Sequence, residues 1–493
     1  MLAPHHPTMN ADMDRHSKHD DVQHENTVQH GNIVRDRRDK GDAEIEIVPV
    51  GYPYKQHDAV FGEIDGEHGP NYRNVGWMGS CVLMMKANVG LGVLSIPYVY
   101  QVLGIAPGTI VIILIQAMVT WSDWVVGCFK LNHPEVYGLA DVGFVLFGKV
   151  GREVLATSFT IYMIFVCGSG LVSISTALNA VSIHATCTAV FIVVAAAVGW
   201  GLCSIRTMGQ ITWLGWIGMV SIMAGILAMT VAVGVQDRPS DAPKTGPWDR
   251  DLKAVGSPTF ADAISAVASV IFAASATPTY FGIISEMRDA RDFNKSMFSA
   301  QLFVTVTYVV IGLVVYCFCG QYVSYPALGS AGPLMKRVSY GLAIPGLFVT
   351  LTIYSHLPAK YVFVRILRGS KHLTSNSLVH WATWLGCTFT CMATAYIIAS
   401  AIPIFSSLVS FIGAVFCPTM CMIPYGLMWW HDNWRLKNTP ATWRRYSGMA
   451  IASFVTVAGI FLTVAGTYGA IVALINQPSE GKPWSCADNS NSV

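Results

Sequence analysis

The stretch KANVGLGVLSIP, residues 86–97, places a lysine, an asparagine and two glycines inside a long apolar run. In hydrocarbon, non-helical backbone is tolerated only where protein buries it or where it lines a wet cavity, because each unpaired peptide group costs several kcal/mol. Gly90 and Gly92 weaken a helix, and the Asn88 amide can hydrogen-bond opened backbone. We therefore expect a broken helix here, and we expect it to line a cavity.

The composition around this stretch is that of a membrane protein. Of the 493 residues, 53% are hydrophobic and 12% are charged, against about 25% charged in an ordinary soluble domain. A helix needs about 20 mostly apolar residues to cross a bilayer. The predicted fold class is therefore an all-α polytopic membrane protein with eleven spans. We expect these spans at residues 76–102, 106–129, 154–181, 186–204, 211–235, 260–287, 298–320, 340–364, 378–402, 405–429 and 448–475.

The chain divides into a membrane domain and two tails. Residues 1–72 are polar, rich in histidine and without an apolar signal-peptide core, so we expect a disordered cytosolic tail with no metal site. Residues 73–475 form the predicted transmembrane domain, and residues 476–493 form a short C-terminal tail. Loops on the side of the first tail carry more Lys and Arg than the others, which predicts a cytosolic N-terminus. A net charge of +2 without a basic stripe excludes a nucleic-acid partner.

Most of the 12 cysteines stand inside apolar runs, where a free cysteine behaves as a small hydrophobic residue. No cysteine spacing that also supplies histidines matches a zinc site. Only Cys486 is expected outside the membrane without an explanation.

A second interruption, FAASATP at residues 272–278, falls in the sixth expected span. Pro278 removes a backbone donor and clashes with the preceding turn, and the small residues allow close approach. If spans one to five and six to ten are corresponding halves, each half opens with a broken helix. Such paired interruptions indicate the central site of a transporter.

Several motifs resemble the amino acid/auxin permease family, most closely its fungal branch of neutral amino acid permeases. They are GLGVLSIP at 90–97, FGIISEMRD at 281–289, and HLPAKYVFVRILR at 356–368 with HWATWL at 380–385. The resemblance covers about residues 73 to 475. It implies a LeuT-like inverted repeat of five plus five helices with an eleventh helix added. It also implies proton-coupled uptake of amino acids by alternating access.

In that fold, unwound backbone of the first and sixth helices holds the carboxylate and the amine of the substrate. Helix N-termini favour the carboxylate and opened carbonyls favour the ammonium. The family commonly has a glycine or histidine where this chain has Ser275 and Ala276. The implied substrate-binding residues are Asn88, Val89, Gly90, Leu91, Gly92, Phe272, Ala273, Ala274, Ser275, Ala276 and Thr277.

Two cationic side chains are candidates for ion coupling. Lys86 lies about 16 Å into its span at 1.5 Å per residue, too deep to snorkel easily. We expect its ammonium at the place that sodium takes in relatives, facing Thr352 and Ser355. The alternative is a structural pair with Asp123. A histidine ordinarily titrates near neutral pH, so His356 is a candidate for proton coupling, unless it only hydrogen-bonds a carbonyl.

Other polar residues in the spans have weaker assignments. Glu286 is expected in an ion-pair network with the charges that follow it, Lys360 is expected at the interface, and Asp123 is expected near the inner interface. Ser169 and Asn179 either reach the site or pack helices.

The predicted function is secondary active import of a neutral aliphatic or aromatic amino acid, with proton symport. The side chains of Val89, Leu91, Phe272 and Ala276 give the expected cavity an apolar lining without a carboxylate. We expect the plasma membrane rather than the vacuolar membrane. A vacuolar amino acid exporter and a nonconducting amino acid receptor are the alternatives. The chain has no P-loop, HExxH or nucleophile-elbow motif, so no enzyme, cofactor or metal is predicted.

Overall fold

The computed structural model describes most of the chain beyond residue 74. The described ranges are 75–90, 92–205, 208–243, 245–370, 372–373, 377–434, 443–475 and 483–490, with four short strands before them. Strand β1 (Thr27–Gln29) pairs antiparallel with β2 (Asn32–Val34), and β3 (Gln56–Asp58) pairs with β4 (Gly62–Ile64). The expected disorder of residues 1–72 otherwise lies outside the described residues.

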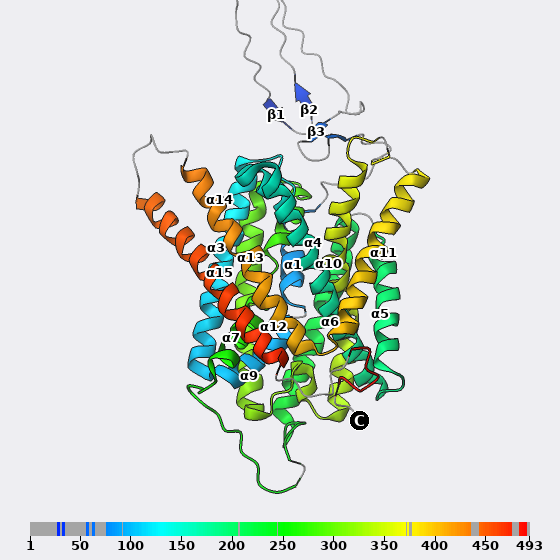
Figure 1. Cartoon of the computed structure of the whole chain (residues 1–493), viewed down its shortest axis with the longest axis vertical. Helices are drawn as coiled ribbons and strands as arrows, with labels where there is room; N and C mark the ends of the chain where they lie inside the picture. The colour runs from blue at the N-terminus through cyan, green and yellow to red at the C-terminus, as the bar shows by residue number, and fades with distance from the viewer. Residues whose placement is uncertain are drawn as a thin grey trace, which may run out of the picture. The chain divides into compact units, whose positions relative to one another are not determined.

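The described membrane domain is built from α-helices joined by short 3₁₀ turns, and its long helices stand side by side (Figure 1). The α-helices are α1 Trp77–Asn88, α2 Ile96–Leu103, α3 Ile105–Asn132, α4 Leu139–Ser182, α5 Thr188–Cys203, α6 Met208–Val235, α7 Phe260–Ala273, α8 Tyr280–Ser285, α9 Phe293–Cys319, α10 Pro333–Leu367, α11 Leu378–Ala401, α12 Phe405–Val415, α13 Cys417–Cys421, α14 Ile423–Trp434 and α15 Trp443–Ile475. The 3₁₀ turns are η1 Gly92–Ser95, η2 Thr277–Thr279, η3 Ala290–Asp292, η4 Gly320–Tyr322 and η5 Ala327–Ser330.

Each of the eleven expected spans coincides with one helix or with one interrupted run of helices. Among the described residues, nine helical segments are long and apolar enough to cross a membrane. A tenth span is the pair Phe405–Val415 and Cys417–Trp434, which bends by 47°. The remaining expected span is α5, an apolar helix of 16 residues. The chain is therefore a multi-pass membrane protein.

Both predicted interruptions are confirmed. The first span is α1, then a break that begins after Asn88, then η1 and α2. The sixth span is α7, then a break at residues 274–276, then η2 and α8. Pro278 stands in the first turn after the second break, where a missing backbone donor is tolerated.

The third span differs from the prediction at its N-terminal end. The helical run begins at Leu139 instead of residue 154, and it kinks at Gly148, which has φ +69°. The chain folds back there, so that a β-carbon added at Gly143 would stand 2.4 Å from the Gly151 carbonyl oxygen. Only glycine adopts this backbone without strain and allows this approach. The segment from Leu139 to Gly148 is thus a short helix of its own, at the N-terminal end of α4.

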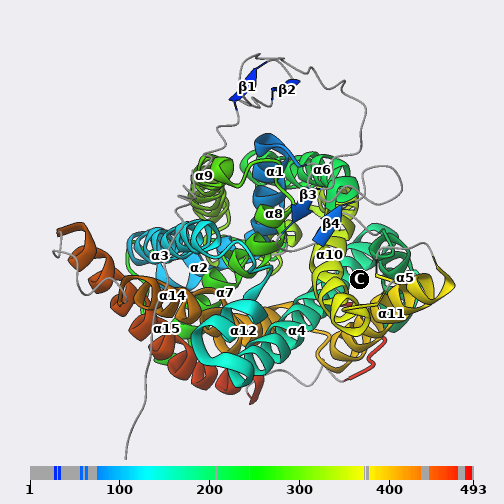
Figure 2. The same ribbon diagram turned by 90° about the horizontal axis from the view of Figure 1, so that it is seen from above.

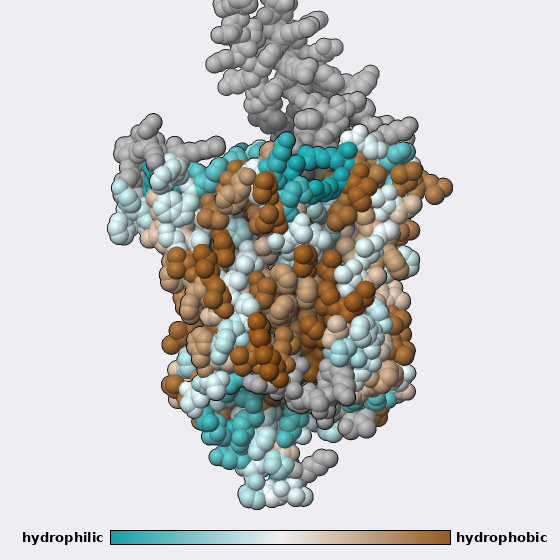
Figure 3. Space-filling model, viewed as in Figure 1, coloured by the Kyte–Doolittle hydropathy of each residue, from teal (hydrophilic) through white to brown (hydrophobic). Residues whose placement is uncertain are grey.

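The surface of the domain fits a bilayer. In the face seen in Figure 3, hydrophobic residues cover the middle of the molecule and hydrophilic residues gather at its two ends. Exposed apolar side chains of α15, among them Phe454, Val457 and Phe461, belong to this belt. Viewed along the helices, α5 and α11 lie side by side at one edge, and α14 and α15 lie side by side at the opposite edge (Figure 2). The broken α1 and α7 segments contact helices of the interior.

Candidate substrate site at the two helix breaks

The two breaks meet in the interior of the membrane domain. A β-carbon added at Gly92 would stand 2.3 Å from the α-carbon of Ala273, so the backbones of η1 and α7 are in direct contact. Asn88, Val89 and the segment 272–277 are each at most 5% exposed. The structure therefore brings the two predicted substrate-binding segments together and buries them. Leu91 lies outside the described residues.

Two tyrosines cap the carbonyl groups that the first break leaves without helical partners. The Tyr354 hydroxyl of α10 donates to the Ala87 carbonyl oxygen at 2.9 Å. The Tyr308 hydroxyl of α9 lies 2.9 Å from the Asn88 carbonyl oxygen. A buried carbonyl without a partner is costly, so these contacts stabilise the end of α1.

The second break is held in the same way. Tyr308 also lies 2.7 Å from the Ala273 carbonyl oxygen, so one hydroxyl bridges both breaks. The Tyr162 hydroxyl of α4 donates to the Ser275 carbonyl oxygen at 2.7 Å. The Ser275 hydroxyl turns back to the Phe272 carbonyl oxygen at 2.6 Å. Sequence analysis missed these tyrosines, because an aromatic residue in a span is also an ordinary core residue.

Lys86 is fully buried and lies beside the first break. Its ammonium donates to the Val89 carbonyl oxygen at 3.1 Å and to the Thr350 hydroxyl of α10 at 2.5 Å. The expected bridge between the first and eighth spans is therefore present, but the partner residue was wrong. The hydroxyls of Thr352 and Ser355 instead accept no bond from Lys86 and donate to carbonyls of their own helix, at 2.8 and 3.3 Å.

The error is one of helical register. At 3.6 residues per turn, Thr352 lies about 200° around the helix from Thr350. The face that carries Thr350 is turned toward α1, since a β-carbon added at Gly90 would stand 2.8 Å from the Thr350 hydroxyl. The threonine nearest to Lys86 could not be chosen from hydrophobic periodicity alone.

Asn88 and Asp123 also differ from expectation. The Asn88 side-chain amide donates to the Tyr280 hydroxyl at 2.8 Å and to the Met84 carbonyl oxygen at 3.0 Å. Asp123 is fully buried, about nine residues or 14 Å from the end of α3. The Gln301 amide of α9 donates to its Oδ2 atom at 2.5 Å, and the Thr277 hydroxyl beside the second break also interacts with it. Asp123 therefore lies deep in the domain, and the alternative pair with Lys86 does not form.

His356 lies on a different part of α10 from Thr350. Its ring meets the Trp384 ring of α11 edge to face, with centroids 5.2 Å apart. Within the described part of the chain, neither ring nitrogen makes a hydrogen bond of good geometry, although the backbone of Cys203 and Ile205 interacts with the ring. The motif at residues 356–368 therefore packs against the motif at residues 380–385, and this contact does not involve the two helix breaks.

Glu286 and Lys360 form a buried ion pair, with the ammonium 2.5 Å from the carboxylate and side chains 1% and 7% exposed. Glu286 was expected in an ion-pair network, and the structure adds Lys360 of α10 as its partner. The position of Lys360 at the membrane interface stays a prediction. The pair joins the end of α8 to α10. Backbone bonds add a third element, because Val75 before α1 donates to the Glu286 carbonyl oxygen at 3.2 Å. Removing either charge would leave the other buried.

Asn179 is not in the substrate site. Its amide bonds the Thr188 hydroxyl at 2.7 Å and the side chain of Asn489 at 2.8 Å. Ser169 bonds the Val166 carbonyl oxygen of its own helix at 2.7 Å. Asn179 therefore fastens the C-terminal segment to α4 and α5.

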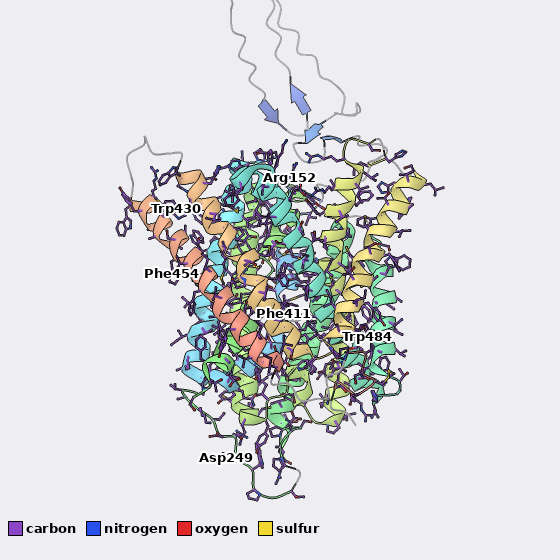
Figure 4. All side chains as sticks on the ribbon, in the orientation of Figure 1. Arg152, Asp249, Phe411, Trp430, Phe454 and Trp484 are labelled. Atoms are coloured by element: carbon purple, nitrogen blue, oxygen red, sulfur yellow. A yellow bond between two sulfur atoms is a disulfide. The ribbon has the colours of Figure 1, made fainter. Side chains whose placement is uncertain are left out.

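A disulfide between Cys187 and Cys486 holds the same C-terminal segment. The segment also bonds α11 through the Trp484 amide and the Ser400 carbonyl oxygen, at 2.9 Å. Lys336 of α10 donates to the Ser490 carbonyl oxygen. Figure 4 places Trp484 toward the end that holds Asp249 and away from the end that holds Arg152 and Trp430. Sequence analysis left Cys486 unexplained because 299 residues separate the two cysteines.

One histidine cluster could hold a metal ion among the described residues. His133 at the end of α3 and His431 beside Asp432 in α14 have donor atoms within 4.8 Å of one another. Asp432 already accepts from His133 at 3.0 Å and from His431 at 3.2 Å. The three side chains therefore fasten α3 to α14 through hydrogen bonds.

The comparisons agree with this architecture. Residues 73–472 match the family described as "Transmembrane amino acid transporter protein". A "Transmembrane transporter" of Gibberella moniliformis is 34% identical over 457 residues, which are 91% of this chain and 96% of the relative. The "N amino acid transport system protein" of Neurospora crassa is 30% identical over 426 residues, which are 84% of this chain and 89% of the relative.

Two solved structures share the fold at 12% identity. MhsT in complex with L-phenylalanine covers 81% of this chain and 100% of its own, with a TM-score of 0.56. A Na+-coupled sialic acid symporter covers 83% and 93%, with a TM-score of 0.50. The fold is therefore the LeuT-like fold, with α15 as the eleventh span. The expected resemblance is confirmed, and the family and the fold are those of transporters. The chain belongs to the family of transmembrane amino acid transporters, the amino acid/auxin permeases.

Proposed function

We propose that the protein imports a neutral aliphatic or aromatic amino acid together with a proton, by alternating access and without chemical conversion of the substrate. The observation that carries the proposal is the contact of the two broken spans at Gly92 and Ala273. A helix break leaves amides at one end and carbonyls at the other without helical partners. Such groups complement the carboxylate and the ammonium of an amino acid.

The proposed site consists of residues 88–92 and 272–277. Its side chains set the substrate class, because those of Val89, Phe272 and Ala276 are apolar and buried. Neither segment contains a carboxylate that would pair with a cationic side chain. A buried unpaired charge is costly, which favours a neutral substrate.

Lys86 is proposed to replace sodium. Its ammonium bridges the Val89 carbonyl oxygen and the Thr350 hydroxyl, and thus places a fixed positive charge between the first and eighth spans. A tethered cation there would make transport independent of sodium. His356 is a candidate for the titrating group of the proton step. Retention of pH-dependent uptake in His356→Gln would remove it from this role.

We place the protein in the plasma membrane with its N-terminus in the cytosol. The disulfide Cys187–Cys486 supports this orientation, because disulfides persist in oxidising compartments and are rare in the cytosol. It joins the α4–α5 loop to the C-terminal segment, both on the side that charge distribution predicts to be outside.

The test is a competition panel of labelled amino acids in proteoliposomes. We expect competition by aliphatic or aromatic amino acids and none by lysine, arginine, aspartate or glutamate. Uptake should be unchanged when potassium replaces sodium. Lys86→Met should reduce uptake strongly, whereas Lys149→Met, an exposed lysine of the α4 run, should not. Binding without accumulation would instead identify a receptor, and localisation of the protein to the vacuolar membrane would identify a vacuolar exporter.

A further inference from the structure

A chain of polar side chains leads from the first break to a buried carboxylate. Asn88 donates to the Tyr280 hydroxyl at 2.8 Å, and the Gln301 amide lies 3.3 Å from the same hydroxyl. Gln301 also donates to Asp123 at 2.5 Å. The chain joins α1, α8, α9 and α3, and each of these four side chains is at most 3% exposed. It therefore connects Asp123 to a residue of the proposed substrate site.

These four hydrogen-bonded side chains have fewer hydrogen-bond donors than their acceptor atoms could use. The Asp123 Oδ1, Asn88 Oδ1 and Gln301 Oε1 atoms are buried acceptors that receive no hydrogen bond of good geometry from the described residues, and the Thr277 hydroxyl interacts with Asp123 without meeting that geometry. A buried polar atom without a partner is unfavourable. One proton added to Asp123 would convert an orphaned acceptor into a donor and would remove a buried negative charge.

No cation neutralises Asp123 instead. Lys86 directs its ammonium to Val89 and Thr350, and no Lys, Arg or His of the described chain interacts electrostatically with Asp123. Its titratable neighbours are Tyr280, Cys421 and Tyr425, which are ordinarily uncharged at neutral pH. Other charged groups on elements packed against α3 lie near helix ends: Arg291 and Asp292 of η3, Lys295 of α9, Asp262 of α7, and the pair His431 and Asp432 of α14.

We propose that Asp123, and not His356, carries the proton that is transported with the amino acid. The proton binds to the Oδ1 atom as an O–H bond and leaves as H⁺ on the opposite side of the membrane. The hydrogen-bonded side chains Asp123, Gln301, Tyr280 and Asn88 couple protonation of Asp123 to the first break. A charged carboxylate accepts the hydrogen bond of Gln301 more strongly than a neutral carboxylic acid does. Protonation of Asp123 therefore changes the hydrogen bonds of Gln301 and Tyr280, and through them the orientation of Asn88 beside the substrate. The inference rests on the proposed proton symport.

The test uses the purified full chain in proteoliposomes, with an inward proton gradient and a labelled neutral amino acid. Asp123→Asn keeps the shape of the protonated side chain without its titration. We expect this variant to exchange labelled for unlabelled substrate and to lose gradient-driven accumulation at least tenfold. Ser122→Ala is the control, since the buried Ser122 hydroxyl bonds the Met118 carbonyl oxygen of its own helix. It should accumulate substrate as the wild type does.

A second variant covers the case in which Asp123→Asn does not fold. Gln301→Leu removes the amide that stabilises the charged carboxylate, so the pH of half-maximal uptake should shift upward by at least half a unit. An unchanged pH profile would overturn the assignment, as would gradient-driven accumulation by Asp123→Asn. Accumulation driven by a sodium gradient would also overturn it. Failure of the wild type to respond to either gradient would instead contradict the proposed symport itself.

Discussion

The backbones of Gly92 and Ala273 touch, so that a β-carbon on Gly92 would stand 2.3 Å from the α-carbon of Ala273. Each residue belongs to the broken opening helix of one half of the molecule. The contact is possible only because residue 92 has no side chain, since backbone cannot move aside as a flexible side chain can.

Gly92→Ala should therefore separate the two breaks and abolish uptake. We expect loss of at least tenfold in transport rate at equal amounts of folded protein in the membrane. Gly386→Ala is the control, because its added β-carbon meets no atom within 4 Å. Normal uptake by Gly92→Ala would show that the close contact is unnecessary for transport.

Tyr162→Phe should weaken substrate binding without disrupting packing. The change removes the hydroxyl that donates to the Ser275 carbonyl oxygen, and leaves the ring in place. A hydrogen bond of this kind contributes about 0.5–1.5 kcal/mol, so we expect the KM for uptake to rise by up to about tenfold. The exposed Tyr446 supplies the control variant Tyr446→Phe. A KM unchanged within twofold would argue against a role of Tyr162 in shaping the site.

The Glu286–Lys360 pair predicts strong coupling between two substitutions. Glu286→Gln leaves a buried ammonium, a change that costs about 3–5 kcal/mol. We expect a lower thermal midpoint in detergent and partial recovery in the double variant Glu286→Gln, Lys360→Met. Glu153→Gln breaks the exposed pair with Arg365 and should have little effect, because exposed pairs contribute about 0–1 kcal/mol. Additive effects of the two buried substitutions would mean that the pair does not act as a unit.

The disulfide predicts sensitivity to reduction from one side only. A membrane-impermeant reductant outside intact cells should break the Cys187–Cys486 bond and lower the thermal midpoint of the subsequently purified protein. The variant Cys187→Ser, Cys486→Ser should have the lower midpoint without reductant. Cys317→Ser, which changes a free cysteine, should behave as the wild type does. Protection of the bond from external reductant would contradict a plasma-membrane protein with a cytosolic N-terminus.

The sequence was sufficient for features that depend on local composition. Both breaks could be predicted because Gly90 and Gly92 weaken a helix, and because Pro278 is tolerated at the start of a helix but opposes continuation of one from the preceding turn. Partners across the fold could not be predicted. The choice of Thr350 over Thr352 depends on the rotation of α10 about its axis. The role of Tyr308 depends on α9 lying against both breaks at once. These relations arise from packing between distant segments, and hydrophobic periodicity does not encode them.

A structure determined with a bound neutral amino acid tests the central claim most directly. The account predicts ligand density between residues 88–92 and 272–277, with its carboxylate and ammonium against the opened backbone. Density for the transported amino acid elsewhere in the domain, with these two segments still packed against each other, would contradict it.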